Sequence, residues 1–167
     1  LRTGTKNQNN SQLKYLFKKG IKMSQTLELR IKEHEGFRNT IYLDSLGKKT
    51  VGIGHLCVED HWEEDREYEE AYLMNIFEGD LREACGNAES LIKEHITSGI
   101  HLDESIEHVL VEMVFQLGIG GVGKFSKMWK ALDEGNNEEA ANQMLDSRWH
   151  SQTPSRAEDL AEIVASA

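Results

Sequence analysis

The sequence of 167 residues has little of what interrupts helices. Proline occurs once, at Pro154, and aromatic residues make up 7% of the chain, whereas 29% of the residues are charged. This composition is typical of a mostly helical protein with a charged surface. The hydrophobic content of 38% is enough to form a core in one domain, or in two small lobes, of this length.

Cysteine and long apolar runs are also scarce. Only Cys57 and Cys85 are present, which excludes the disulfide framework of a small secreted protein, and we expect both to be free thiols. No stretch approaches the roughly 18 consecutive apolar residues of a membrane span. Residues 1–23 lack the apolar segment of a signal peptide. We therefore expect a protein that is held in the cytoplasm after synthesis and does not insert into membranes.

Charge is divided unevenly along the chain. Residues 1–23 carry six basic residues and no acidic one, and the remaining 13 basic and 29 acidic residues give residues 24–167 a net charge of −16. Nucleic acid repels so acidic a body, so we expect no DNA or RNA partner. We interpret residues 1–23 as a flexible basic leader, with Met23 as a natural start. The alternative is a short basic helix at 13–21 that touches anionic surfaces.

The first part of the presumed domain is predicted to form a helix followed by a β-hairpin. Apolar spacing favours a helix over residues 25–35, and strands are predicted at 40–43 and 50–53. Glu35 ends the helix, and Asp44 begins the turn between the strands. Because the hairpin folds the chain back, both carboxylates can face one cleft.

The rest of the chain is predicted to be helical. Apolar periodicity indicates helices over about 65–95, 103–118, 125–132, 140–145 and from Pro154 onward. Gly118 is expected to end the second of these helices, and Thr153 to cap the last. The predicted fold class is α+β and mostly helical. It divides residues 24–167 into a small N-terminal lobe (about 36–64), a connecting helix (about 65–95) and a helical C-terminal lobe (about 96–167) packed with the first helix (25–35).

Two carboxylates across a cleft are what the hydrolysis of a glycosidic bond requires. One must be protonated to give a proton to the leaving sugar oxygen, and the other must be ionised to activate a water or to attack directly. Glu35, at a helix end near apolar groups, fits the acid, and Asp44, in a solvated turn, fits the base. The Thr50 hydroxyl is suited to hold the attacking water. With 29 acidic residues in the chain, this spacing alone is also common by chance.

Three separated motifs strengthen the glycosidase hypothesis. They are Glu35-Gly36 with Ile41-Tyr42-Leu43-Asp44 and Thr50-Val51-Gly52-Ile53-Gly54-His55, then MVFQLG at 113–118, then SRWHSQTPSRA at 147–157. In this order they resemble the phage-type lysozymes, glycoside hydrolase family 24. The resemblance implies a lysozyme-like two-lobed fold and a monomeric muramidase without a cofactor. Such an enzyme cuts, with inversion, the β-1,4 bond between N-acetylmuramic acid and N-acetylglucosamine in peptidoglycan.

The resemblance also implies roles for individual residues. Glu35 would be the general acid, with Asp44 positioning the water alongside Thr50. The implied substrate-binding residues are Gln116, Gly54 and Phe115, and the implied structural supports are His55, Asp80, Arg148 and Arg156. The segment that holds Trp149, Gln152 and Thr153 would lie near the active side of the C-terminal lobe.

Two of these supports carry specific expectations. His55 is expected to pair with Asp80 and so to link the hairpin to the connecting helix, and such a pair raises the pKa of the histidine. Arg156 is expected to steady Glu35. His34 stands where the T4 phage member of the family has an acid, so we expect any pairing between Arg156 and an acid at that position to be lost.

The biological use implied by the resemblance is host lysis. A phage endolysin would wait in the host cytoplasm and reach the wall by a separate route, such as a holin. Alternatively, the domain cuts as part of a phage tail or injection device, or it is an inactive, glycan-binding or tail-structural module on a lysozyme scaffold. The presence of Glu35, Asp44 and Thr50 together favours the enzyme.

Two other signals receive little weight. A zinc-dependent peptidoglycan amidase could use His55, Cys57, His61 and Cys85, but their spacing matches no strong zinc pattern. The glycine-rich segment GIGGVG at 118–123 follows a predicted helix rather than a strand, so a tight connection between helices explains it better than a dinucleotide site.

Overall fold

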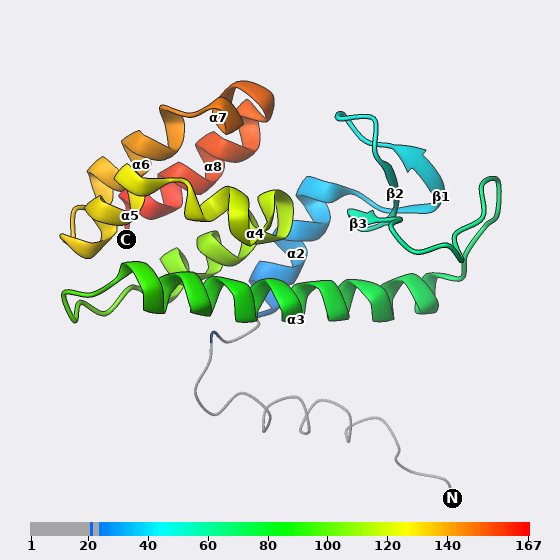
Figure 1. Cartoon of the computed structure of the whole chain (residues 1–167), viewed down its shortest axis with the longest axis horizontal. Helices are drawn as coiled ribbons and strands as arrows, with labels where there is room; N and C mark the ends of the chain where they lie inside the picture. The colour runs from blue at the N-terminus through cyan, green and yellow to red at the C-terminus, as the bar shows by residue number, and fades with distance from the viewer. Residues whose placement is uncertain (1–20, 22–23) are drawn as a thin grey trace, which may run out of the picture.

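The chain folds as two lobes at the two ends of one long helix (Figure 1). A computed structural model describes Ile21 and residues 24–167. The sequence-predicted leader therefore lies outside the described residues, apart from Ile21, which is buried. The fold class is α+β and mostly helical, as predicted. In chain order the elements are α2 (Gln25–Glu35), β1 (Arg38–Leu43), β2 (Lys49–Gly52), β3 (His55–Leu56), α3 (Glu70–His95), α4 (Glu104–Gly123), α5 (Ser126–Asp133), α6 (Asn137–Leu145), α7 (Arg148–Gln152) and α8 (Pro154–Ala165).

Helix α2 carries Glu35 to the boundary between the lobes. The hydroxyl of Ser24 accepts a hydrogen bond from the backbone N–H of Leu27 and so begins the helix. Leu27 and Ile31 are buried in the core that α2 shares with the C-terminal helices. Gly36, with φ of 70°, ends the helix directly after Glu35. In Figure 1, α2 lies between the sheet and the C-terminal helices.

The sheet of the N-terminal lobe is antiparallel, with the order β1-β2-β3. The hairpin was predicted, but the two-residue strand β3 was not, because a pair of residues carries no periodicity. The buried face of the sheet forms a separate small core in which Val51 packs with Tyr68 and Leu73. Leu73 belongs to α3, which begins at Glu70 rather than at the predicted residue 65 and runs beneath both lobes.

Helix α4 is the core helix of the C-terminal lobe. It is long and apolar enough to span a membrane by length and composition, but Ile106 and the segment 108–114 are buried inside the fold. Gly118 has φ of 72° and interrupts the helix where the sequence predicts its end. The predicted tight connection between helices is confined to Gly118, however, because after this kink the chain is helical again as far as Gly123.

The start of α8 also differs from the prediction. Thr153 occupies the N-cap position before Pro154, but its side chain makes no capping hydrogen bond. Instead, its hydroxyl donates to the carbonyl oxygen of Trp149 at 3.3 Å and accepts from the side chain of Gln116. Trp149 belongs to α7, a helix too short to be recognised from periodicity. Thr153 therefore links α7 and α8 to the wall of the site described below.

Candidate active site

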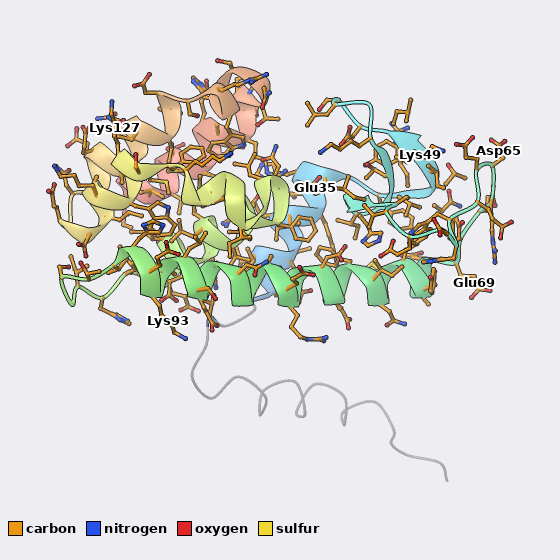
Figure 2. All side chains as sticks on the ribbon, in the orientation of Figure 1. Glu35, Lys49, Asp65, Glu69, Lys93 and Lys127 are labelled. Carbon is orange, nitrogen blue, oxygen red and sulfur yellow. The ribbon has the colours of Figure 1, made fainter. Side chains whose placement is uncertain are left out.

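A cavity of about 200 Å³ lies between the lobes. All the residues predicted to be catalytic or substrate-binding line this cavity. Its lining includes Glu35, Asp44 and Thr50, together with Gly54, Phe115 and Gln116. Figure 2 shows Glu35 at this boundary, between the sheet and the C-terminal helices. Residues that are 81 positions apart in sequence thus face one space.

Glu35 is held by an arginine from the last helix. Nη1 of Arg156 lies 2.7 Å from Oε1 of Glu35, and both side chains are largely buried. The second carboxylate oxygen, Oε2, faces the backbone of Gly54. A Cβ atom on Gly54 would lie 2.8 Å from this oxygen, and the φ of 70° also favours glycine there. The position of Glu35 therefore depends on its salt bridge with Arg156 on one side and on the absence of a side chain at Gly54 on the other.

Asp44 is held by its own turn. Its Oδ1 accepts the backbone N–H groups of Leu46 and Lys48, each at 2.8 Å. The backbone N–H of Gly47 in turn bonds to the Asp44 carbonyl oxygen. Within the described part of the chain, Oδ2 of Asp44 has no hydrogen-bond partner. One carboxylate oxygen is thus fixed and the other remains available for a ligand.

Two hydroxyl groups complete the hairpin side of the cavity. The buried hydroxyl of Thr50 donates to the Lys48 carbonyl oxygen at 3.1 Å, so its oxygen can still accept a hydrogen bond from water. Tyr42, which the sequence analysis did not single out, also lines the cavity. Burial, reinforced by the negative charge of Glu35, raises the pKa of Tyr42. Its hydroxyl therefore stays protonated and able to donate.

The opposite wall of the cavity comes from α4 and is fixed by α7. Nε1 of Trp149 donates to Oε1 of Gln116 at 2.8 Å, and the Gln116 amide nitrogen lies 3.4 Å from the Thr153 hydroxyl. Phe115 packs with its ring edge-on against Phe77 of α3. Gln116 and Phe115 are therefore held in place before any ligand arrives.

Arg148 does not behave as the structural support that the sequence analysis expects. It is exposed, and the described residues give it no hydrogen bond or ion pair. It lines a second hollow, of about 490 Å³, together with Lys124 and Lys127 from the segment after α4. Gln152 lines both this hollow and the cavity at Glu35, so the two adjoin.

The expected pair of His55 and Asp80 is present. Nδ1 of His55 lies 2.7 Å from Oδ2 of Asp80, which joins β3 to α3. The hydrogen bond to Asp80 raises the pKa of His55, against the opposing effect of burial, and Glu59, 3.7 Å from the other ring nitrogen, adds to the increase.

The proposed zinc ligands do not gather. Among Ile21 and residues 24–167, no group of three or more histidine, cysteine, aspartate or glutamate side chains is arranged to hold a metal ion. Cys57 and Cys85 are both free thiols. Burial raises the pKa of Cys85 to about 11, as expected for an unreactive core thiol.

A buried acid that was not predicted lies next to the site. Glu112 of α4 has no exposed surface, and its carboxylate contacts Arg30, His34 and Arg156. Position 34 offers Arg156 no acid, as expected, but Glu112 from α4 supplies a neighbouring carboxylate instead, with its Oε1 3.4 Å from Nε of Arg156. A signal was present, since Glu112 is the single charged residue in the apolar run VLVEMV.

The profile of the family described as Phage lysozyme matches residues 32–162, which is most of the chain. Together with the two-lobed fold, this match places the protein among the phage lysozymes, and the chain belongs to that family.

Three curated proteins illustrate the range of relatives. The chain is 28% identical to "Probable T4-type lysozyme 2" of Dictyostelium discoideum and 27% identical to "Probable T4-type lysozyme 1" of the same organism. These matches cover 84% and 85% of the chain and 94% and 95% of the relatives. It is also 28% identical to the "Pre-baseplate central spike protein Gp5" of Enterobacteria phage T4, where 80% of the chain matches 26% of the longer protein. The chain thus spans about a quarter of the length of that spike protein.

Proposed function

We propose that the protein is a muramidase that cuts the β-1,4 bond between N-acetylmuramic acid and N-acetylglucosamine in peptidoglycan. The observation that carries this proposal is the pair of differently held carboxylates, Glu35 and Asp44, in one cavity between the lobes. Membership of the phage lysozyme family supports a lysozyme-type activity. The specific bond and the inverting mechanism are what the resemblance to the phage-type lysozymes implies, and the two carboxylates of the site support them.

The two carboxylates suit an inverting reaction. Protonated Glu35 gives its proton to the leaving sugar oxygen as the glycosidic C–O bond breaks. The contact of Arg156 with Oε1 leaves Oε2 to carry that proton. The Thr50 oxygen helps to hold a water molecule, and the free oxygen of Asp44 takes a proton from it. The water oxygen then bonds to the anomeric carbon, from the face of the sugar opposite to the leaving oxygen. This reaction needs roughly 6.5–9.5 Å between the carboxyl groups to admit the water.

The adjoining hollow fits a peptidoglycan strand. Among the described residues, three cationic side chains, Lys124, Lys127 and Arg148, and a single acidic one, Asp146, line this hollow. The domain as a whole is strongly negative. Peptidoglycan carries peptides with free carboxylates beside its sugars. A cationic hollow that continues from the cavity at Glu35 can bind those carboxylates while the sugars occupy the cavity.

The experiment that tests the proposal measures the release of reducing sugar ends from purified peptidoglycan, with and without EDTA. We expect the wild type to be active in both conditions. Glu35→Gln removes the proton donor but keeps the size of the side chain and should lower the rate by about 10²–10⁴-fold. Glu33→Gln, at an exposed position of the same helix, is the matched control and should retain wild-type activity.

Other results would select another function. Wall lysis that releases no sugar ends and is abolished by EDTA would favour a zinc amidase, because an amidase cuts an amide bond and creates no reducing end. A wild type that binds the wall but neither lyses it nor releases sugar ends would indicate an inactive binding module. If the proposal holds, NMR of the first product should show the α-anomer, because displacement by water inverts the β-configuration.

For the biological role, we propose host lysis by an endolysin that acts as a monomer and reaches the wall from the host cytoplasm through a separate release route. The similarity to a T4 spike protein favours a second candidate, a cutting or structural part of a phage tail. Mass spectrometry distinguishes them, because a tail component is retained in purified phage particles and an endolysin is found free in the lysate.

A further inference from the structure

The carboxylate of Glu112 is surrounded by two arginines and a histidine at the junction of three helices. Its side chain is completely buried on α4. Two residues of α2 contact it. Nε of Arg30 lies 2.6 Å from Oε2 of Glu112, and Nδ1 of His34 contacts Oε1. From α8, Nε of Arg156 lies 3.4 Å from the same Oε1. A buried carboxylate is costly unless it is paired, and these contacts account for its presence.

The same arginine connects this cluster to the cavity. Arg156 contacts Glu112 through one end of its guanidinium group and Glu35 through the other. Its Nε and Nη2 are buried and, within the described residues, make no hydrogen bond. Besides the single bond from Nη1 to Glu35, the position of this guanidinium therefore depends on the ion pair with Glu112.

A general acid beside an arginine presents an electrostatic difficulty. The acid must be protonated to work, whereas a neighbouring positive charge favours its ionised form. A second carboxylate on the far side of the arginine reduces that effect. Glu112 occupies this position, and Val111 and Met113 on either side of it are buried, so water does not screen its charge.

We propose that Glu112 is a positioning residue for the general acid: it holds Arg156 in place and balances its charge, so that Arg156 can orient Glu35 without keeping it ionised. The inference rests on the proposed muramidase function. The other charged or titratable groups of the cluster are His34, Arg30, Asp159, which lies 3.4 Å from His34, and Tyr42 on the cavity side. One turn earlier on α4, His108 pairs with Glu104.

The test substitutes Glu112→Gln, which keeps the shape of the side chain and removes its charge. Two properties are measured: the pH profile of kcat/KM on peptidoglycan, and the ionisation of the Glu35 carboxyl followed by 13C NMR. We expect the alkaline limb of the profile and the NMR midpoint of Glu35 both to move to lower pH, by about one unit. At pH values above the wild-type limb, activity should fall about tenfold, with KM little changed.

Asp133→Asn is the matched control. Asp133, the last residue of α5, is likewise a carboxylate with a structural role, because it accepts hydrogen bonds from the backbone N–H groups of Thr97 and Ser98, but it does not belong to the cluster around Glu112. This substitution should lower the melting temperature without moving the limb or the midpoint. Adding His34→Asp to the Glu112→Gln variant returns a negative charge to the cluster and should move the midpoint back toward the wild-type value.

The outcomes separate this inference from the proposed function. A folded Glu112→Gln variant whose Glu35 midpoint is unchanged or higher would overturn the inference, whatever the activity. An inactive wild type would overturn the muramidase proposal, while the NMR titration would still test Glu112. If Glu112→Gln does not fold, Glu112→Asp can replace it. The aspartate side chain is shorter by one methylene, so its carboxylate lies farther from Arg156, and the Glu35 midpoint should shift in the same direction by a smaller amount. An unshifted midpoint in that variant would also overturn the inference.

Discussion

The two sides of the cavity hold their carboxylates in different ways. Asp44 is fixed by backbone N–H groups two and four residues further along the chain. Glu35 is fixed by Arg156, which is 121 positions away, and through it by Glu112. The hairpin side thus depends on local structure, and the helical side on the packing of α2, α4 and α8 against one another.

This difference has consequences for how each side tolerates change. A turn that bonds to its own backbone can form before the rest of the protein, and it tolerates any substitution that keeps the acceptor oxygen. A buried ion cluster forms only when three helices meet, and removing one member leaves the others without a partner. We therefore expect substitutions at Asp44 to separate chemistry from stability, and substitutions around Glu35 to affect both.

The largest expected effect is the loss of activity in Asp44→Asn. Asparagine keeps the oxygen that accepts from Leu46 and Lys48 but cannot take a proton from water. We expect the rate of reducing-end release to fall by about 10²–10⁴-fold, with the free energy of unfolding changed by less than about 0.5 kcal/mol.

Asp44→Ala provides the comparison, because it removes the turn hydrogen bonds as well. It should be equally inactive but less stable, by about 0.5–1.5 kcal/mol in a urea titration. If Asp44→Asn is destabilised as strongly as Asp44→Ala, the turn does not depend on the acceptor oxygen and the proposed separation is wrong.

A smaller effect is expected where the two sides touch. In Gly54→Ala, the added methyl group would lie 2.8 Å from Oε2 of Glu35. Glu35 must then shift, and we expect activity to fall about tenfold or more through misplacement of the proton donor. The φ of 70° adds about 1–2 kcal/mol of backbone strain.

Gly99→Ala is the matched control, because Gly99 has φ of 83° and no atom within 4 Å of the added carbon. It should show the strain alone, as a lower melting temperature with normal activity. Equal activity losses in the two variants would mean that contact with Glu35 is not the cause.

The contrast between local contacts at Asp44 and long-range contacts at Glu35 also explains which features could be predicted from the sequence. The hairpin and the place of Asp44 in its turn follow from residues close together in sequence, and so does the end of α2 at Gly36. The role of Glu112 does not, because a lone acid in an apolar run gives no sign of which cations will surround it. Likewise, the exposed place of Arg148 and the helical turn after Gly118 depend on tertiary packing that overrides local signals.

The third prediction concerns a contact that joins the sheet to α3 without touching the cavity carboxylates. Asp80→Asn removes the charged partner of His55, and we expect a loss of about 1–3 kcal/mol in the free energy of unfolding, with reducing-end release maintained. Because the folded-state pKa of His55 is raised, the stabilisation is fully present below the unfolded pKa of about 6.5 and is lost as the pH rises through the folded pKa.

The measurement is the melting temperature of both proteins across this pH range. The difference between wild type and Asp80→Asn should be largest at mildly acidic pH and shrink toward alkaline pH. Over the same range the difference between wild type and Asp133→Asn should stay constant, and it should shrink only at more acidic pH. Hydrogen bonds from backbone N–H groups, that of Ser98 above all, lower the pKa of Asp133. The stabilisation by Asp133 is therefore present above about pH 3.9 and is lost as the pH falls further. A difference for Asp80→Asn that does not change with pH would show that the link between β3 and α3 is a neutral hydrogen bond rather than an ion pair.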